Sequence, residues 1–277
     1  MTVDTTDIDY NNKLVAFIDI LGFRNYVQQP PDKIKHTIHV INDVLSHAIN
    51  IVRTNNRENI FSIKLFSDCV CISSNLDNIQ EFLYELAYIQ CWFSMHGIFL
   101  RGALSKGLHY ENDNIIFSQG LIKAYEHEQN AIYPRIVIER ETIQMINSQN
   151  TTYVMKAPDR TSFVDYLNFI YEEGNSNAED ILALHKNSIL NQVREHADNI
   201  RILEKYRWLT EYHNIKANEF IGNPGDWEDA YYQELKNKMV IPISQYFPSF
   251  RKPQNELKKK QLPQQGSIQQ SNQGDGE

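Results

Sequence analysis

Two aspartates, each at the edge of an apolar strand-like segment, carry the chemistry that this sequence suggests. Asp19 interrupts the apolar run 14–23, and Asp68 stands between the runs 60–66 and 69–73. A carboxylate buried at such a place is costly unless a cation meets it, and a divalent metal ion is the natural partner. Two carboxylates can hold two divalent ions about 4 Å apart, one activating an attacking oxygen and one stabilising a leaving phosphate. The pair therefore predicts a metal centre.

The residues after Asp19 predict a place for a phosphate group. The run continues through Gly22 and Phe23 to Pro30 and Pro31, where a helical pattern begins. Backbone N–H groups in such a segment can receive phosphate oxygens. A metal ion together with a triphosphate is therefore the leading hypothesis.

Composition narrows the class of protein. The chain has 277 residues, of which 42% are hydrophobic, so it can bury a large core. A net charge of −8 and a pI near 5.6 argue against a nucleic-acid partner. Three cysteines without metal-site spacing fit a reducing cytosol. No run approaches the roughly 20 apolar residues of a membrane span, and residues 1–12 lack an export signal, so we expect a cytoplasmic protein.

Hydrophobic periodicity predicts the order of the strands and helices. The predicted strands are 13–20, 60–66, 69–73, 98–107, 115–117 and 133–139, and the predicted helices are 32–52, 75–96 and 118–127. This order predicts an α+β fold in which helices cover one face of a mostly antiparallel sheet. In a βαββ unit the end of the first strand and the hairpin of the next pair can be adjacent. Asp19 and Asp68 can therefore meet.

Four parts are predicted along the chain. Residues 1–12 form a polar leader, 13–158 a domain that holds both acids, 159–250 a helical lobe and 251–277 a disordered tail. Within the lobe, helical patterns rich in aromatic residues cover 163–171, 178–199, 200–218 and 227–238. The tail is rich in Lys, Gln, Ser and Gly and has almost nothing to bury.

Three short motifs carry a resemblance to class III nucleotidyl cyclases. Segment 17–23 matches every fixed position of the family's metal-binding strand, Phe-x-Asp-Ile-x-Gly-Phe. The second motif, Lys-x-x-Gly-Asp, appears from Lys64 to Asp68 with Ser in place of Gly. The third, Leu-Arg-x-Gly-Ile-x-x-Gly, is echoed at 100–107. The motifs follow the family order within about one hundred residues, so together they are a fairly specific resemblance.

The resemblance implies a ferredoxin-like palm domain and a role for each matching residue. The Asp19 and Asp68 carboxylates and the Ile20 carbonyl would hold two Mn²⁺ or Mg²⁺ ions, and Arg101 would be catalytic. The implied nucleotide-binding residues are Phe17, Gly22, Phe23, Lys64 and Lys106. The reaction would be an in-line attack of the ribose 3′-oxygen on the α-phosphorus with loss of pyrophosphate, which positioning and charge neutralisation can largely accelerate.

The third predicted helix departs from the family pattern. Family members usually carry Asn-x-x-x-Arg there, whereas this chain has Ile122 and Glu126 at the expected positions. An acid does not stabilise phosphoryl oxygens, so the charge would come from Lys123, Lys106 or Arg101. In adenine-specific relatives an acid accompanies the matching lysine, and its position falls near Ile115 here, which argues against an adenine pocket.

The whole pattern is similar to the stand-alone pyrimidine cyclases of bacterial antiphage (Pycsar) systems. That resemblance covers 13–139 by motif and 205–214 more loosely. It implies synthesis of cyclic UMP from UTP, or of cyclic CMP from CTP as the next choice, as a signal read by a separate effector. It also implies a homodimer.

Simpler interpretations stay open for the same residues. Asp19 could cap a helix, Asp68 could be an ordinary turn residue, and Arg101 and Lys64 could pair with surface acids. A nucleotide-binding sensor that lost catalysis is the second hypothesis. A polymerase-like or dinucleotide-forming palm enzyme is the third, although the Gly-Gly-Asp/Glu hairpin of those relatives is absent.

Overall fold

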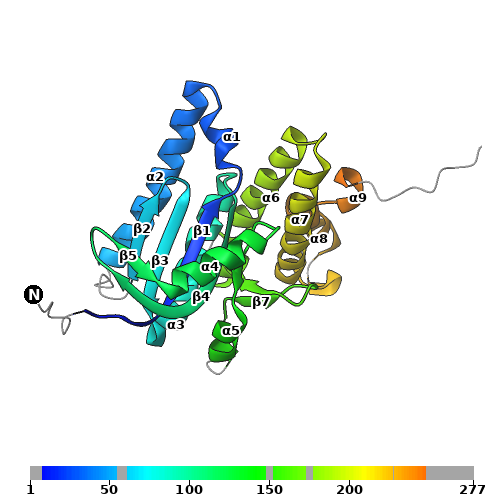
Figure 1. The fold of residues 1–277 in the computed structure, drawn as a ribbon. Coiled ribbons are helices and arrows are strands. Elements are labelled where there is room, and N and C mark those ends of the chain that lie inside the picture. The colour runs from blue at the N-terminus through cyan, green and yellow to red at the C-terminus, as the bar shows by residue number, and fades with distance from the viewer. Residues whose placement is uncertain (1–7, 55–60, 148–151, 173–176, 227, 248–277) are drawn as a thin grey trace, which may run out of the picture. The chain divides into compact units, whose positions relative to one another are not determined.

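The computed structural model describes residues 8–54, 61–147, 152–172, 177–226 and 228–247, which form a mixed sheet with helices (Figure 1). Within these residues, eight strands join in the order β2-β3-β1-β4-β6-β8-β7, with β5 paired to β4. The strands are β1 Asn11–Ile20, β2 Phe61–Phe66, β3 Cys69–Asn75, β4 Leu100–Glu111, β5 Ile116–Ser118, β6 Ile136–Ile138, β7 Val154–Lys156 and β8 Ser162–Val164. The β4–β6 pair is parallel and the other pairs are antiparallel. The predicted α+β class is confirmed.

The helices alternate with these strands through the first half of the chain and dominate its second half. They are α1 Phe23–Val27, α2 Pro31–Thr54, α3 Ile79–Met95, α4 Gln119–Asn130, α5 Arg140–Asn147, α6 Ala178–Glu195, α7 Ile200–Ile221, α8 Asp229–Met239 and α9 Ile243–Tyr246, with 3-10 turns at Leu76–Asn78, Tyr166–Tyr171 and Pro224–Asp226. No helix among the described residues is both long and apolar enough to cross a membrane.

The first four strands have the ferredoxin-like arrangement. Their order β2-β3-β1-β4 is fully antiparallel, with the α2 connection before β2 and the α3 connection before β4. Central β1 pairs with β4 along its whole length and with β3 from Lys13 to Asp19. The end of β1 therefore lies beside the turn that joins β2 to β3.

Side chains of β1 alternate between two faces, and both faces are covered. Leu14, Ala16 and Ile18 belong to the main core, which also contains the buried residues of α3. Phe17 belongs to a second, smaller apolar cluster formed by Ala103, Ala124, Ala131 and Val137. Asp19 shares the Phe17 face because the two residues are two positions apart.

The face that carries Phe17 is covered by α4, which corrects the prediction that helices lie on one face only. Figure 1 shows α4 crossing in front of β1 and β4. Glycines permit the close approach: a Cβ at Gly107 would lie 2.6 Å from the Gly120 nitrogen, and one at Gly120 would lie 2.8 Å from Val15 Cγ2. The continuous apolar run 14–18 was the available signal, because a strand that is apolar on both faces is typical of a sheet covered on both sides.

The second half of the chain is less regular than predicted. Residues 162–164 form β8 instead of helix, because Phe163 pairs with Val137 and Met155 in the sheet, and only Tyr166–Tyr171 is helical, as a 3-10 turn. The helical patterns at 178–199, 200–218 and 227–238 correspond to α6, α7 and α8. The predicted boundary at 158 and 159 falls between the paired strands β7 and β8, and the division into two domains stays a prediction. The predicted tail and residues 1–7 of the leader lie outside the described residues.

Candidate active site

The end of β1 and the β2–β3 turn bring Asp19 and Asp68 together. Asp19 lies opposite Cys69 in the β1–β3 pair, and the Ile20 N–H donates to the Asp68 carbonyl at 3.1 Å. One ligand atom from each of Asp19, Asp68 and Cys69 lies within 4.8 Å of the other two. Ser67 adopts a left-handed backbone (φ 57°) where the family motif has glycine, the residue that this conformation favours. The two acids thus form one acidic centre.

Arg101 of β4 is the cation that meets Asp19. The two residues lie opposite each other in the β1–β4 pair, and Arg101 Nη2 donates to Asp19 Oδ2 at 3.2 Å. The same nitrogen contacts Glu128 Oε1, and Nη1 donates to the Ala131 carbonyl at 3.3 Å. The guanidinium is therefore fixed between two carboxylates and a carbonyl.

Glu128 is a residue of this site that the sequence analysis did not single out. It is buried on α4, with 1% of its surface exposed, and Gln129 Nε2 donates to its Oε2 at 2.8 Å. The stretch 126–129 reads as a polar, solvated helix end. One signal was available: Gly120, Ala124 and Glu128 recur every four residues, which places Glu128 on the buried face of α4.

The surroundings of Asp19 disfavour the ionised form of its carboxyl group. Burial raises the pKa of Asp19 to about 6; Arg101 opposes this rise, and the nearby Asp68 and Glu128 carboxylates add to it. Desolvation and two acidic neighbours thus outweigh the single guanidinium. The acidic centre has more negative charge than its own cation neutralises.

The donor set fits a hard divalent cation. Burial raises the pKa of the Cys69 thiol to about 11, and the neighbouring Asp68 and Asp19 carboxylates add to the rise. A protonated thiol is a poor metal ligand, so the two carboxylates are the effective donors. Carboxylate and carbonyl oxygens are the ligands that Mg²⁺ and Mn²⁺ prefer, and excess negative charge at the centre favours a cation.

The segment after β1 places Gly22 and Phe23 just beyond the acidic centre. The Leu21 N–H donates to the Phe99 carbonyl at 2.8 Å, and the Gly22 carbonyl accepts from the Asn25 N–H at 2.8 Å. Gly22 has a positive φ of 78°, which turns the chain into α1. The first N–H groups of a helix have no acceptor within it, so Phe23 presents a free donor there. The phosphate-binding role of Gly22 and Phe23 stays a prediction.

A groove of about 630 Å³ on the Phe17 face is lined by two of the predicted nucleotide-binding residues, Phe17 and Lys64. Phe17 and Tyr125 contact edge to face in it, with ring centroids 5.5 Å apart. Lys64, which lies opposite Cys71 on the same face, forms an ion pair with Asp113 at 3.8 Å. An acid does accompany Lys64, from the turn before Ile115, where the sequence analysis expected none.

Lys106 is not brought to the acidic centre of its own chain. It pairs with Leu14 in the β1–β4 ladder, so its side chain lies on the face opposite Arg101 and Asp19. Five residues separate it from Arg101, about 16 Å along an extended strand. Its predicted phosphate contact has no support from this placement.

The surface of α4 provides no free cation at the expected positions. Ile122 and Glu126 are both exposed. Lys123, the alternative, forms ion pairs with Glu139 at 3.2 Å and Glu141 at 3.4 Å. The positive charge that the family takes from this helix is therefore missing from it.

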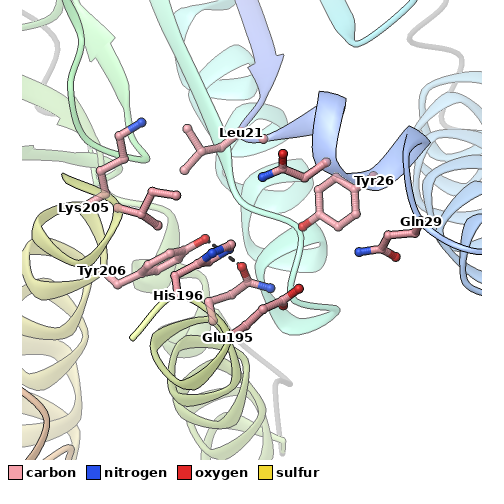
Figure 2. Close-up of a pocket in the computed structure, with 11 residues that line it drawn as sticks. Leu21, Tyr26, Gln29, Glu195, His196, Lys205 and Tyr206 are labelled. Atoms are coloured by element: carbon pink, nitrogen blue, oxygen red, sulfur yellow. Dashed lines mark hydrogen bonds between the residues drawn. The ribbon is translucent and has the colours of Figure 1, made fainter. Parts of the chain in front are cut away.

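A second cavity, of about 90 Å³, lies between the segment after β1 and the helices α6 and α7 (Figure 2). It is lined by Leu21 and Gly22 on one side and by Lys205 and Tyr206 on the other. The Tyr206 hydroxyl donates to Gln192 Oε1 at 2.9 Å. The segment that follows Asp19 is therefore next to α7.

Comparisons with known proteins concern the fold. No protein-family model and no curated protein matches the chain. Solved structures that are similar include a bacterial light-regulated adenylyl cyclase, with 11% identity over 66% of this chain and 59% of that one at a TM-score of 0.42. This chain thus spans 59% of the length of that relative.

Two further structures have similar folds. The guanylyl cyclase domain of the RhoGC fusion protein from the aquatic fungus Blastocladiella emersonii is 15% identical over 56% of this chain and 93% of that one, with a TM-score of 0.41. The adenylyl cyclase CyaB from P. aeruginosa is 15% identical over 55% of this chain and 91% of that one, with a TM-score of 0.36. Each likeness is one of strand and helix arrangement, and the functional proposal below is built on the residues of this chain.

Proposed function

We propose that the chain is a nucleotidyl cyclase that converts a pyrimidine nucleoside triphosphate to a 3′,5′-cyclic nucleotide and pyrophosphate. UTP is the favoured substrate and CTP the next. The observation that carries the proposal is the convergence of Asp19, at the end of central strand β1, and Asp68, in the β2–β3 turn, with ligand atoms within 4.8 Å of each other. The residues around both acids resemble the metal-binding motifs of class III nucleotidyl cyclases, and the Gly-Gly-Asp/Glu hairpin of polymerase-like relatives is replaced by Phe66-Ser67-Asp68.

Asp19, Asp68 and the Ile20 carbonyl would hold the metal ions. When bound, two divalent ions would neutralise phosphate charge and favour loss of the proton from the ribose 3′-hydroxyl. Burial beside the Asp68 and Glu128 carboxylates raises the pKa of Asp19, and this unfavourable placement of an acid supports the assignment. The Ile20 N–H, which donates to the Asp68 carbonyl, would keep the two ligand-bearing segments in register.

Arg101 would neutralise charge on the phosphate chain. Glu128 and the Ala131 carbonyl hold the guanidinium independently of Asp19. Once the Asp19 carboxylate has a different cation, Arg101 would keep its position and direct one edge toward an incoming phosphate oxygen. Glu128 is then a positioning residue for Arg101.

The groove with Phe17 and Lys64 would receive the base. Phe17 and Tyr125 offer ring surfaces for stacking, whereas Lys64 would donate to O4 of uracil. Asp113 beside it would accept from the 4-amino group of cytosine. This pair of a donor and an acceptor supports a base-reading role, and it fits adenine as well as either pyrimidine, so the choice of a pyrimidine rests on the sequence resemblance.

A homodimer is part of the proposal. Leu65, Phe66, Ile115 and Tyr125 line the same groove and are 50%, 83%, 55% and 48% exposed. Apolar side chains gathered at this density on a surface favour burial against a partner. A second copy of the chain would cover them and close the groove. The cyclic nucleotide would then act as an antiphage signal for a separate effector.

The test is product analysis with each of the four NTPs and Mn²⁺. We expect pyrophosphate and a cyclic nucleotide from UTP or CTP, and no product from Asp68→Asn under the same conditions. An exposed substitution, Asp198→Asn, is the matched control because it removes one carboxylate from the turn between α6 and α7. Absence of product from all four nucleotides, or full turnover by Asp68→Asn, would refute the proposal.

A catalytically inactive nucleotide sensor is the second candidate. The exposed Ile122 and Glu126 on α4, where the family pattern has Asn and Arg, favour it. Metal-dependent binding of a nucleoside triphosphate without release of pyrophosphate would select this candidate over the cyclase.

A further inference from the structure

A cyclase site in this chain requires positive charge for the phosphates that α4 does not supply. Among the described residues, Lys123 is engaged by Glu139 and Glu141, and Lys106 is on the opposite face of the sheet. Arg101 is already shared between Asp19 and Glu128. Together, a triphosphate and the carboxylates of Asp19, Asp68 and Glu128 carry more negative charge than two divalent ions and one shared guanidinium offset, so a further cation near the end of β1 is expected.

Helix α7 is attached to the end of β1 through one aromatic contact and one backbone hydrogen bond. Tyr206 is buried and contacts Phe99 edge to face, with ring centroids 5.6 Å apart. The Phe99 carbonyl in turn accepts the Leu21 N–H at 2.8 Å, two residues after Asp19. The residue next to Tyr206 on α7 is therefore held near the segment that follows Asp19.

That residue is Lys205, which lines the second cavity together with Leu21 and Gly22. Figure 2 shows its ammonium group directed toward the side where Leu21 lies and away from Glu195 and His196. Burial and the nearby Arg101 guanidinium lower the pKa of Lys205, and the Asp19 carboxylate raises it, so both groups lie within its electrostatic reach.

Lys205 is half-buried, and within the described ranges it makes no hydrogen bond or ion pair. A half-buried lysine usually packs its methylene stem on the protein and brings its charged end to a carboxylate or to solvent, and Lys205 has no carboxylate partner in hydrogen-bond or ion-pair distance among the described residues. The other cations around the acidic centre have partners, whereas this one is available to an anion that arrives from outside.

We propose that Lys205 binds the phosphate chain of the nucleotide, so that α7 of the C-terminal helices supplies the charge that α4 lacks. The inference rests on the proposed function, because it needs a nucleoside triphosphate at Asp19 and Asp68. It gives the C-terminal helices a direct part in the site of their own chain. The ligand chemistry is that of a β- or γ-phosphate oxygen, which a lysine meets as a point charge.

The test measures nucleotide binding without turnover. The probes are the 3′-deoxy triphosphates of the four bases, which lack the attacking hydroxyl, and the matching 3′-deoxy monophosphates, each titrated with Mn²⁺ by calorimetry. Loss of one charge-assisted hydrogen bond weakens binding by about tenfold or more. We expect Lys205→Met to weaken triphosphate binding by at least that factor and to change monophosphate binding less than about twofold. Lys205→Arg should restore most of the loss.

Lys35→Met is the control, since it makes the same change at an exposed lysine of α2. Thermal midpoints of all variants report whether the fold is intact. Suppose wild type binds triphosphates. If Lys205→Met binds them equally well, or if its affinity for triphosphate and monophosphate falls by the same factor, the Lys205 inference is wrong and the proposed function stands. If wild type binds none of the four triphosphates with Mn²⁺, the proposed function is wrong and the inference fails with it.

Discussion

Replacing Asp19 by Asn should stabilise the metal-free protein while removing its ability to bind metal. Burial and two neighbouring acids raise the pKa of the Asp19 carboxyl from 3.8 to about 6 in the folded chain. Above that pH the Asp19 carboxyl is ionised in both states, and ionisation is less favourable in the folded protein than in the unfolded chain. Asn has nearly the same shape and no charge, so it removes this cost.

The size of the effect follows from the shift. A raised carboxyl pKa means that the folded state binds more protons than the unfolded state between pH 3.8 and about 6, so stability falls as pH rises through that window. About two pKa units correspond to about 3 kcal/mol at pH 8, which is an upper limit because the Asn amide must also be desolvated. For a protein of this size, about 3 kcal/mol raises the thermal midpoint by up to about 6–12 °C.

The assay is thermal unfolding of wild type and Asp19→Asn at pH 4 and pH 8, with chelator and with Mn²⁺. In chelator the variant should be more stable at pH 8, and the difference should disappear near pH 4. Mn²⁺ should raise the midpoint of wild type only, since a ligand that binds only the folded state stabilises it. Asp198→Asn should match wild type throughout. A variant less stable than wild type at pH 8 in chelator, or a difference that does not change with pH, would refute this account of Asp19.

Three further variants test the surroundings of the acidic centre. Glu128→Gln should weaken the hold on Arg101 and lower kcat by about tenfold while Mn²⁺ binding persists, and unchanged kcat would remove Glu128 from the site. Lys64→Met should change the ratio of kcat/KM for UTP and CTP by about fivefold or more without changing Mn²⁺ binding, which assays on both substrates can measure. Phe66→Ser should shift the chain from dimer to monomer in sedimentation experiments, because it removes the most exposed apolar side chain of the groove.

The sequence predicts the first half of the fold well because the hydrophobic periodicity of its helices and strands is clear there. The helices around 32–52 and 75–96 and the strands before and after them appear as α2, α3 and β1 to β4. The meeting of Asp19 and Asp68 follows from that order, since a βαββ unit places the end of β1 beside the next hairpin. Local pattern and topology were sufficient for this pair.

Other features of the site depend on contacts that no local pattern contains. Glu128 is buried and Glu126 is exposed because only one face of α4 packs on β1 and β4. Lys205 shares a cavity with Leu21 and Gly22 because α7 packs on the first half of the chain, as in the contact of Tyr206 with Phe99. Residues 162–164 read as helical by composition and became a strand because β6 and β7 offered pairing partners.

The central claim is that Asp19 and Asp68 hold divalent ions against a nucleotide, and counting bound Mn²⁺ by electron paramagnetic resonance tests it most directly. Wild type with a saturating 3′-deoxy pyrimidine triphosphate should bind two ions per chain. Asp19→Asn and Asp68→Asn should each lose at least one of them, whereas Asp198→Asn should keep both. Two ions retained in both site variants, or none bound by wild type, would contradict the claim.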